Sequence, residues 1–422
     1  MQTIFVAAPG VQSIDAWLPL ALEQKRQHDG EIVIVFPYLW VLELASENDP
    51  LLRIITDNEF VVACKLFPFS FYVKFKSFAD LMRYVRMIQY FKNAINFRSL
   101  DNFSFYHRIR LLLRGSGSWN CILTIKFFRF SPRGVMIWDI LNLNPEPYRS
   151  LRSLILKTKL WHRISVNVAP IYIEDVAPNV LKATRFDYQL SHSEQQTKSM
   201  IQQYGFSRSQ IIETCVPKFD QVWINYLESF SLHDYQSFSP YALLVSRGAD
   251  PPLLESDQRL RILEEVIFQI CEVRSMSLLV KLHPNERQSS FDHDVAEVSK
   301  RRFVSEDALS RIKLVHDHVI VAAKYAHFGL AYYSSTVADM VRVGCPAIQV
   351  LPLFDTDCVN LKLEKQKFDY GFVELVHSIS SLPTTLDNID LQRDTFIAFQ
   401  RESWSNYFVF DTKFNVKSVL SG

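Results

Sequence analysis

The sequence predicts an α/β fold with two domains, each made of alternating strands and helices. Its 422 residues are enough for two domains of ordinary size, and 48% hydrophobic with 22% charged residues is a globular composition. Short apolar runs are followed by segments of helical spacing, the order typical of β-loop-α units. We expect domains at residues 1–230 and 241–390, a linker at 231–240, and a tail at 391–422 that packs back on the first domain.

The first domain opens with a pattern that suits a Rossmann-like unit. We expect a strand at residues 3–8, a loop at 9–13, a helix at 14–27 and a second strand at 31–36. The loop lacks GxGxxG, so no dinucleotide site is indicated. Asp15 is either a carboxylate facing a cleft or an acid that complements the helix dipole, and the second interpretation is favoured.

The second domain contains a strand-turn-helix-strand segment with three adjacent hydroxyls. An apolar run at 328–333 stops at Ser334-Ser335-Thr336, a helical spacing follows, and Gly344 precedes a strand at 347–351. Hydroxyls and unpaired N–H groups at a helix start can donate to a phosphate oxygen, so this turn is a candidate phosphate site. The alternative is that Thr336 is an ordinary N-cap with Asp339 as its capping partner.

A histidine follows the other strand that we single out in this domain. The run at 277–282 (SLLVKL) reads as a buried parallel strand that stops at His283-Pro284. Proline cannot donate to the ladder and favours an extended residue before it, which leaves the imidazole at the carboxyl end of the strand. Ligands of open α/β sheets bind at that edge, although a lone histidine there can also be structural.

Together these motifs resemble the nucleotide half of a GT-B glycosyltransferase. Lys281-Leu282-His283-Pro284, then the hydroxyl turn, then Gly344-Cys345-Pro346 are similar to bacterial sialyl-, polysialyl- and Kdo transferases, and more distantly to CDP-glycerol glycerophosphotransferases. The resemblance implies two Rossmann-like domains facing a central cleft. It further implies donor-binding roles for these residues: Ser246, Arg247, Lys281, His283, Pro284, Ser334, Ser335 and Thr336.

The first domain carries weaker similarities to the same enzymes. Glu174-Asp175-Val176 resembles an acid-acid-glycine motif whose first acid deprotonates the acceptor, with Val176 in place of the glycine. Paired carboxylates raise one pKa toward the range of a general base, whereas the alternative is a solvated acidic loop. Residues 211–220 (IIETCVPKFD) resemble a domain-exit motif, with Cys215 where glycine is usual.

The resemblance implies transfer of a sugar from a nucleotide donor, the sugar being sialic acid or a related keto-sugar. The acceptor would be a surface glycan, such as a capsule polysaccharide, or a lipid-linked acceptor. Glu174 or Asp175 would be the base, with Asp15 a further candidate, and His283 would support the leaving phosphate. CMP is the favoured nucleotide, with CDP or UDP as alternatives. We expect no metal and no cofactor, since the nucleotide sugar is itself the substrate.

Two other functions stay open at this point. A sugar-nucleotide isomerase of the UDP-GlcNAc 2-epimerase type shares the fold but would need several acids in the cleft. A noncatalytic subunit of a capsule assembly is the third. Products from CMP-, CDP- and UDP-linked donors distinguish the three.

Charge is distributed unevenly along the chain. Residues 71–163 hold 17 Lys and Arg against four acids, a local +13 that leaves −12 elsewhere for the total of +1. A helix there with an apolar stripe could lie on an anionic membrane, or could face the core with a solvated basic side. Nucleic acid is not expected as a partner. The stripe is Phe75, Phe78, Leu81, Met82, Val85 and Ile88, with Lys76, Arg83 and Arg86 off it.

Cysteine usage and hydropathy bear on the compartment. The six cysteines are scattered and form no CxxC pair, which indicates neither a zinc site nor a disulfide framework. The N-terminus reads as a strand rather than a signal peptide, and no run of 18 apolar residues is free of charge. We expect a cytoplasmic protein, with peripheral association at the inner membrane face as an alternative.

Overall fold

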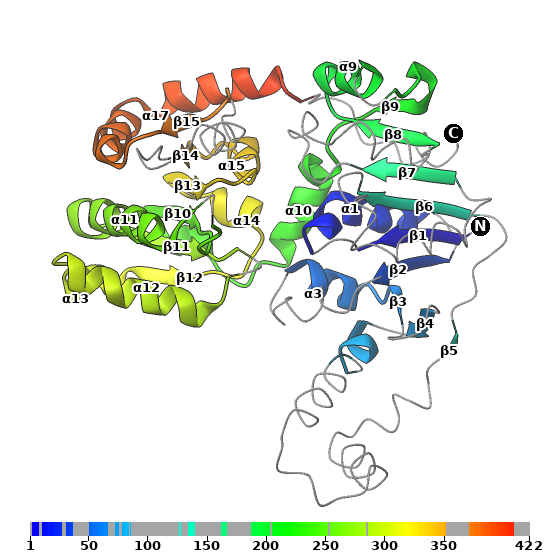
Figure 1. Ribbon diagram of the computed structural model, residues 1–422, viewed down its shortest axis with the longest axis horizontal. Coiled ribbons are helices and arrows are strands. Elements are labelled where there is room, and N and C mark those ends of the chain that lie inside the picture. The colour runs from blue at the N-terminus through cyan, green and yellow to red at the C-terminus, as the bar shows by residue number, and fades with distance from the viewer. Residues whose placement is uncertain are drawn as a thin grey trace, which may run out of the picture.

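The computed structural model describes residues 2–7, 11–27, 31–36, 50–65, 72–75, 78–83, 85, 126–127, 134–139, 162–166, 187–202, 205–251, 254–283, 286–351 and 371–408. They form two α/β domains, one around a nine-stranded sheet and one around a six-stranded sheet (Figure 1). The α/β class with two Rossmann-like domains of GT-B type is therefore confirmed.

The first sheet has the order β5-β4-β3-β2-β1-β6-β7-β8-β9. All neighbours are parallel except at the edge, where β4 is antiparallel to both β3 and β5. The strands are β1 (Gln2–Val6), β2 (Ile32–Phe36), β3 (Val61–Lys65), β4 (Tyr72–Phe75), β5 (Lys126–Phe127), β6 (Gly134–Asp139), β7 (His162–Val166), β8 (Tyr188–Ser191) and β9 (Ile211–Glu213).

Helix α1 (Val11–Gln27) covers the centre of this sheet. The Trp17 indole is fully buried, donates to the Val6 carbonyl at 3.1 Å, and packs on Phe5 with ring centroids 5.3 Å apart. This polar contact satisfies the indole N–H inside an apolar core. The domain also contains α3 (Pro50–Asp57), α9 (Glu194–Gln202) and α10 (Gln221–Ser229), and 3₁₀ turns at Arg208–Gln210 and Pro217–Phe219.

The second sheet is parallel throughout and has the order β12-β11-β10-β13-β14-β15. Counted from its first strand this is 3-2-1-4-5-6, the doubly wound order whose ligand crevice lies where the order reverses. That point is between β10 and β13. The strands are β10 (Tyr241–Val245), β11 (Ser277–Lys281), β12 (Ile312–Leu314), β13 (Phe328–Tyr332), β14 (Ala347–Val350) and β15 (Glu374–Val376).

A glycine sets the close packing of α15 (Val337–Arg342) on β13. A Cβ at Gly329 would lie 2.5 Å from the Met340 sulfur, so a larger residue there would force the buried Met340 side chain to move. Gly344, with φ 79°, ends the helix in the left-handed conformation. The other helices are α11 (Ser256–Ile267), which continues as a π turn at Phe268–Val273, α12 (Gln288–Arg301), α13 (Glu306–Ser310), α14 (Val319–Ala323) and α17 (Leu382–Ser405), with 3₁₀ turns at Tyr235–Phe238 and Ile379–Ser381.

The last described helix and the linker both contact the opposite domain. Helix α17 runs along the top of Figure 1, and its Trp404 packs on Phe219 with ring centroids 5.2 Å apart. In the linker the Tyr235 hydroxyl donates to buried Asp317 of the second domain at 3.0 Å, while Arg53 of α3 approaches the same carboxylate at 3.4 Å. Aromatic packing and buried polar contacts thus join the domains.

Most predicted elements agree with the structure. The strands expected at 3–8, 31–36, 277–282, 328–333 and 347–351 are confirmed to within two residues at each end. Two details were wrong. Helix α1 begins at Val11 rather than at 14, and Phe75 ends strand β4 instead of opening a helical stripe, because its backbone pairs with Val62.

Candidate functional site

Three adjacent strands of the second sheet bring predicted site residues to one edge. Arg247 follows β10, His283 follows β11, and Ser334 follows β13, in the spatial order β11-β10-β13. Carboxyl ends of neighbouring parallel strands meet at the same edge, and here that edge includes the reversal point of the strand order. The sequence motifs therefore converge where a doubly wound sheet binds its ligands.

The hydroxyl turn begins with a backbone in an uncommon conformation. Tyr333 has φ 44°, in the left-handed region that a tyrosine rarely adopts. The Ser334 hydroxyl lies 2.8 Å from the Thr336 hydroxyl and accepts from the Thr336 N–H at 3.3 Å. All three hydroxyl residues are partly exposed. The turn thus presents polar side chains at the edge of the sheet.

The alternative that Thr336 is a capping residue with Asp339 as its partner is wrong. Thr336 stands at the N-cap position, but its side chain makes no capping hydrogen bond. Asp339 is 2% exposed and contacts the Lys218 ammonium at 2.6 Å instead. Its carboxylate is therefore committed to a residue 121 positions away rather than to its own helix.

Arg247 connects two of the three loops. Its guanidinium donates to the Tyr333 carbonyl at 2.7 Å and pairs with Asp250. This contact holds the strained residue that precedes the hydroxyl turn. Because the guanidinium is only partly buried, it also leaves positive charge at the edge where a phosphate would lie.

His283 lies partly buried beside Arg247. Burial, and then the positive charge of Arg247, lower the pKa of the imidazole to about 4. The ring is therefore neutral at pH 7 and can donate through one nitrogen only. The neutral ring can donate its N–H to an anionic oxygen, which the adjacent guanidinium would attract. The negative charge of that oxygen would in turn raise the pKa of the imidazole.

Beneath these loops is a buried ion cluster that the sequence did not reveal. Arg259 of α11 is 4% exposed and pairs with Glu286, which follows His283, and with Asp294 of α12. Its Nε donates to the Arg247 carbonyl at 2.8 Å. One guanidinium thus supports both the loop after β10 and the loop after β11.

Two predicted donor contacts point to other partners in the structure. Ser246 is 1% exposed and its hydroxyl donates to Glu286 at 3.1 Å. The Lys281 ammonium donates to the His316 carbonyl at 2.9 Å, toward β12. Since successive side chains along a strand alternate between faces, residues at a strand end need not face the ligand edge. Donor contact by these two residues stays a prediction.

Several predictions fall outside the described residues. Glu174, Asp175 and Pro284 are among them, as is most of the basic block. Of the apolar stripe, Phe78, Leu81 and Val85 are at most 4% exposed, so these members face the core rather than a surface. This favours the core-facing interpretation of that helix over the membrane-facing one.

At the domain junction the sequence analysis missed a second polar network. Asp15 of α1 contacts His318, the N-cap residue of α14, at 3.0 Å and Lys218 at 3.5 Å. Burial opposes its charge, but His318 and Lys218 lower the pKa of Asp15 to about 2. The helix-dipole interpretation is therefore wrong, and such a low pKa makes Asp15 a weak base. The part of the sequence that could have indicated this network is the VPKFD motif, because it contains Lys218.

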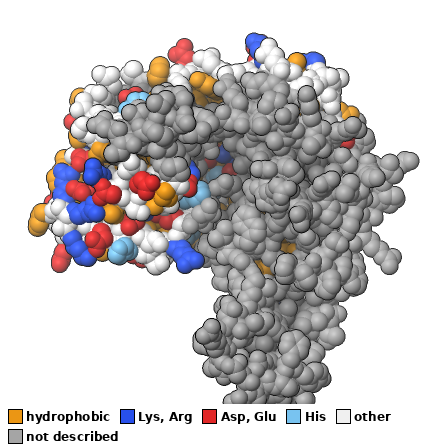
Figure 2. Space-filling view, in the orientation of Figure 1, with side chains coloured by type: hydrophobic (Ala, Val, Ile, Leu, Met, Phe, Trp, Pro, Cys, Tyr) orange, Lys and Arg blue, Asp and Glu red, His pale blue; other side chains and the backbone are white. Residues whose placement is uncertain are grey.

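Charges on the second domain are otherwise mixed. Figure 2 shows acidic and basic side chains interspersed over its visible face, and ion pairs such as Arg301 with Asp257 at 3.0 Å join α12 to α11. Within the described ranges, no group of three or more His, Cys, Asp or Glu is placed to hold a metal ion. In the same residues no helix is long and apolar enough to cross a membrane.

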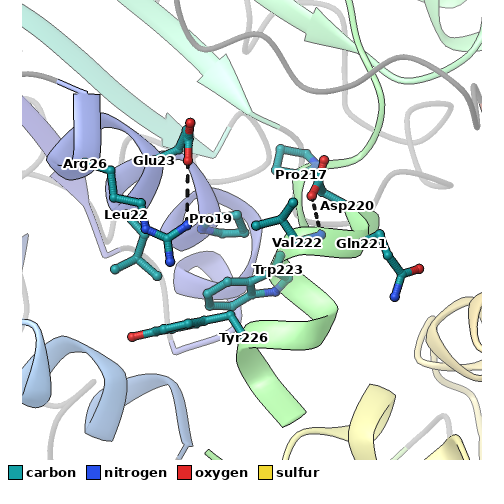
Figure 3. A pocket seen from close by; sticks show the side chains of 10 residues that line it. All are labelled: Pro19, Leu22, Glu23, Arg26, Pro217, Asp220, Gln221, Val222, Trp223 and Tyr226. Carbon is teal, nitrogen blue, oxygen red and sulfur yellow. Dashed lines mark hydrogen bonds and ion pairs between the residues drawn. The ribbon is translucent and has the colours of Figure 1, made fainter. Parts of the chain in front are cut away.

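A cavity of about 310 Å³ lies between α1 and α10, away from this edge. Figure 3 shows the rings of Trp223 and Tyr226 facing Pro19, Leu22 and Arg26 of α1. All of the residues that line the cavity belong to the first domain, so it does not include Arg247, His283 or Ser334.

A buried histidine at the end of β8 yields a testable pH dependence. His192 is fully buried, with Nδ1 3.2 Å from the Thr214 carbonyl, and burial lowers its pKa from 6.5 to about 4. The unfolded chain binds a proton near pH 6.5 and the folded chain only near pH 4. The free energy of unfolding should therefore fall by about 3 kcal/mol as the pH drops through that window.

Chemical denaturation at pH 7 and pH 4.5 checks this prediction, with His192→Asn as the comparison. The variant should lose part of the acid sensitivity whatever its stability at pH 7. Parallel pH profiles for parent and variant would contradict it.

No protein-family model matches the chain, and no curated protein matches it. Solved structures do. The S. aureus protein MnaA with UDP is similar at TM-score 0.54 and 12% identity, over 97% of this chain and 92% of that one. UDP-GlcNAc 2-epimerase from Neisseria meningitidis bound to UDP-GlcNAc is similar at 0.52 and 10%, over 100% and 98%. The wall teichoic acid polymerase TagF is similar at 0.51 and 10%, over 99% and 86%.

These structures share a GT-B type fold with the chain. At 10 to 12% identity they establish the fold and nothing finer. Two of them contain UDP or a UDP-sugar by name.

Proposed function

We propose that this protein is an enzyme acting on a nucleotide sugar, whose phosphates bind at the carboxyl edge of the second sheet. The observation that carries the proposal is the convergence of Arg247, His283 and the Ser334–Thr336 turn at the reversal point of a 3-2-1-4-5-6 sheet. One guanidinium, one imidazole N–H and three hydroxyls offer the donors that a diphosphate needs without requiring a cation. Under this proposal the nucleotide sugar is the substrate, and no cofactor is expected.

The first candidate activity is isomerisation of a UDP-sugar. It is supported by the likeness to the two structures that hold UDP or UDP-GlcNAc. An isomerase needs acidic residues near the sugar, and Asp15 and Asp339 are carboxylates that lie between the domains. Since Asp15 and Asp339 are both paired with Lys218, we assign the proton transfer to Glu174 or Asp175.

The second candidate is sugar transfer, and two observations favour it. The His-Pro and Ser-Ser-Thr motifs resemble sialyl and Kdo transferases, and TagF, a polymerase, shares the fold. In this case CMP would be the nucleotide, Glu174 or Asp175 would deprotonate the acceptor, and His283 would support the leaving phosphate. A surface glycan or lipid-linked sugar would be the acceptor.

Nucleotide binding tests the shared part of the proposal. We expect UDP or CMP to raise the thermal transition, since a ligand at 100 times its Kd adds about 2.7 kcal/mol to the free energy of unfolding. The double variant Ser334→Ala, Thr336→Val should lose most of that rise. Ser378 and Ser380 supply a matched control, because their hydroxyls also lie 2.8 Å apart but follow β15, away from the reversal point. Stabilisation by neither nucleotide would overturn the proposal.

Product analysis then separates the candidates. The protein is incubated with UDP-GlcNAc, and separately with a CMP-linked sialic acid, with and without a glycan acceptor. An isomer formed from UDP-GlcNAc alone establishes the first candidate. Nucleotide release that depends on acceptor establishes the second, and binding without any product indicates a noncatalytic subunit.

A further inference from the structure

Lys218 lies buried between the domains and contacts a carboxylate from each. Its ammonium is 2.6 Å from Asp339 of α15 in the second domain and 3.5 Å from Asp15 of α1 in the first. The residue is 8% exposed and Asp339 is 2% exposed. Burial disfavours the ammonium, but Asp339 and Asp15 outweigh it and raise the pKa of Lys218. The charge is thus kept at neutral pH by carboxylates that belong to different domains.

The first-domain carboxylate is itself fixed from the second domain. The Ile320 N–H donates to Nδ1 of His318 at 3.2 Å, which leaves Nε2 to donate to Asp15 at 3.0 Å. Lys218 therefore binds a carboxylate whose orientation is already set. Because Asp15 is fixed, the buried ammonium of Lys218 is fixed as well, and Asp339 must stay beside it. Moving Asp339 away would leave its charge unpaired and out of contact with water.

A second contact links the Pro217–Phe219 turn, which contains Lys218, to helix α15. Arg342, also on α15, donates through Nε to the Phe219 carbonyl at 2.9 Å. Phe219 is buried against Trp404 and Phe408 of the last described segment. The turn at Pro217–Phe219 thus holds the six-residue helix α15 at both Asp339 and Arg342.

Helix α15 begins at the hydroxyl turn. Asp339 comes three residues after Thr336, which is less than one helical turn, so the anchor of the helix is close to the proposed phosphate site. Short helices depend on tertiary contacts for their order. A site that is ordered before the ligand arrives binds more tightly than one that must be ordered on binding.

We propose that Lys218 is a positioning residue for the nucleotide site: by binding Asp339 it orders α15 and the Ser334–Thr336 turn relative to the first domain. The inference rests on the proposed function, because the turn is taken as the phosphate site. By linkage, bound nucleotide strengthens the same interdomain contact.

The experiment compares UDP and CMP affinity, by calorimetry well below each thermal transition, for the parent, Lys218→Met and Lys324→Met. Lys324 is the matched control, since its ammonium also joins the domains, to Glu228 at 2.7 Å, but through α14 and not α15. We expect Lys218→Met to weaken affinity about tenfold, within the usual range of coupling between sites, and Lys324→Met to leave it unchanged. Lys218→Arg should recover part of the loss.

Hydrogen exchange distinguishes local ordering of α15 by Lys218 from a general contribution of Lys218 to stability. In Lys218→Met, amides of residues 333–343 should exchange faster while those of α11 keep the parent rate. Should Lys218→Met fail to fold, Asp339→Asn removes the same ion pair and must show both effects.

The outcomes separate this inference from the function on which it rests. A parent that binds neither nucleotide overturns both. A parent that binds, together with folded Lys218→Met or Asp339→Asn of unchanged affinity and exchange, overturns the role of Lys218 alone.

Discussion

Arg259→Met is expected to destabilise the second domain by about 3–5 kcal/mol, the cost of breaking a buried ion pair from one side. Arg259 is 4% exposed and is the cation for both Glu286 and Asp294. Methionine has similar length and no charge, so packing is retained while two carboxylates lose their cation. The Arg247 carbonyl also loses a donor at 2.8 Å. Guanidinium chloride denaturation, read as the midpoint and slope of the transition, measures the change.

The same helix provides the control. Arg261, two residues further on, pairs with Asp257 at 2.9 Å, but both side chains are more than half exposed. Exposed pairs contribute little, so Arg261→Met should shift stability by no more than about 0.5 kcal/mol. Equal stability of the two variants would show that the buried cluster contributes no more than a surface pair.

That the loops after β10, β11 and β13 lie at one edge of the sheet could be predicted from the sequence, because it depends on local signals. Segments rich in apolar residues mark β10, β11 and β13, and each ends at a polar or proline-containing segment. Carboxyl ends of parallel strands share an edge, so the sequence could place Arg247, His283 and Ser334 on one edge of the sheet. Their closeness follows only from the strand order β11-β10-β13, which the sequence did not specify.

The ion clusters could not be predicted, because their members are far apart along the chain. Asp15 and His318 are separated by 303 positions, and Arg53 and Asp317 by 264. An aspartate near a helix start has a sufficient local explanation in the helix dipole, and only the fold shows that a tertiary partner replaces it. The VPKFD motif likewise indicated a domain exit, whereas its lysine binds carboxylates from both domains.

The two buried ion clusters support different parts of the proposed site. Arg259 fixes the loops after β10 and β11 from below, through Glu286 and the Arg247 carbonyl. Lys218 fixes the helix after β13 from the side of the first domain. The edge proposed to bind the nucleotide is therefore held by buried charges, while Arg247, His283 and the hydroxyl turn stay partly exposed. Changes in the clusters should act on stability and affinity. At the edge, loss of the turn hydroxyls should act on affinity, and loss of His283 on turnover.

His283→Ala is the variant expected to act on turnover. The imidazole lies at the carboxyl end of β11 beside Arg247, and its pKa of about 4, lowered by burial and then by that guanidinium, keeps it neutral at pH 7. A neutral imidazole N–H can donate to a phosphate oxygen as charge develops there. Removing one such donor typically lowers the rate by about 10²-fold or more. Stability should change little, because His283 is only partly buried.

Initial rates with the nucleotide sugar identified by product analysis measure this effect, alongside the thermal transition. His283→Asn, which retains an N–H donor, should recover part of the lost rate, and His293→Ala, an exposed histidine on α12, should match the parent. A rate effect confined to His283→Ala, with an unchanged transition, assigns the histidine to the substrate phosphate. Full activity of that variant, or unfolding without a separate rate effect, would instead make His283 a packing residue at the end of its strand.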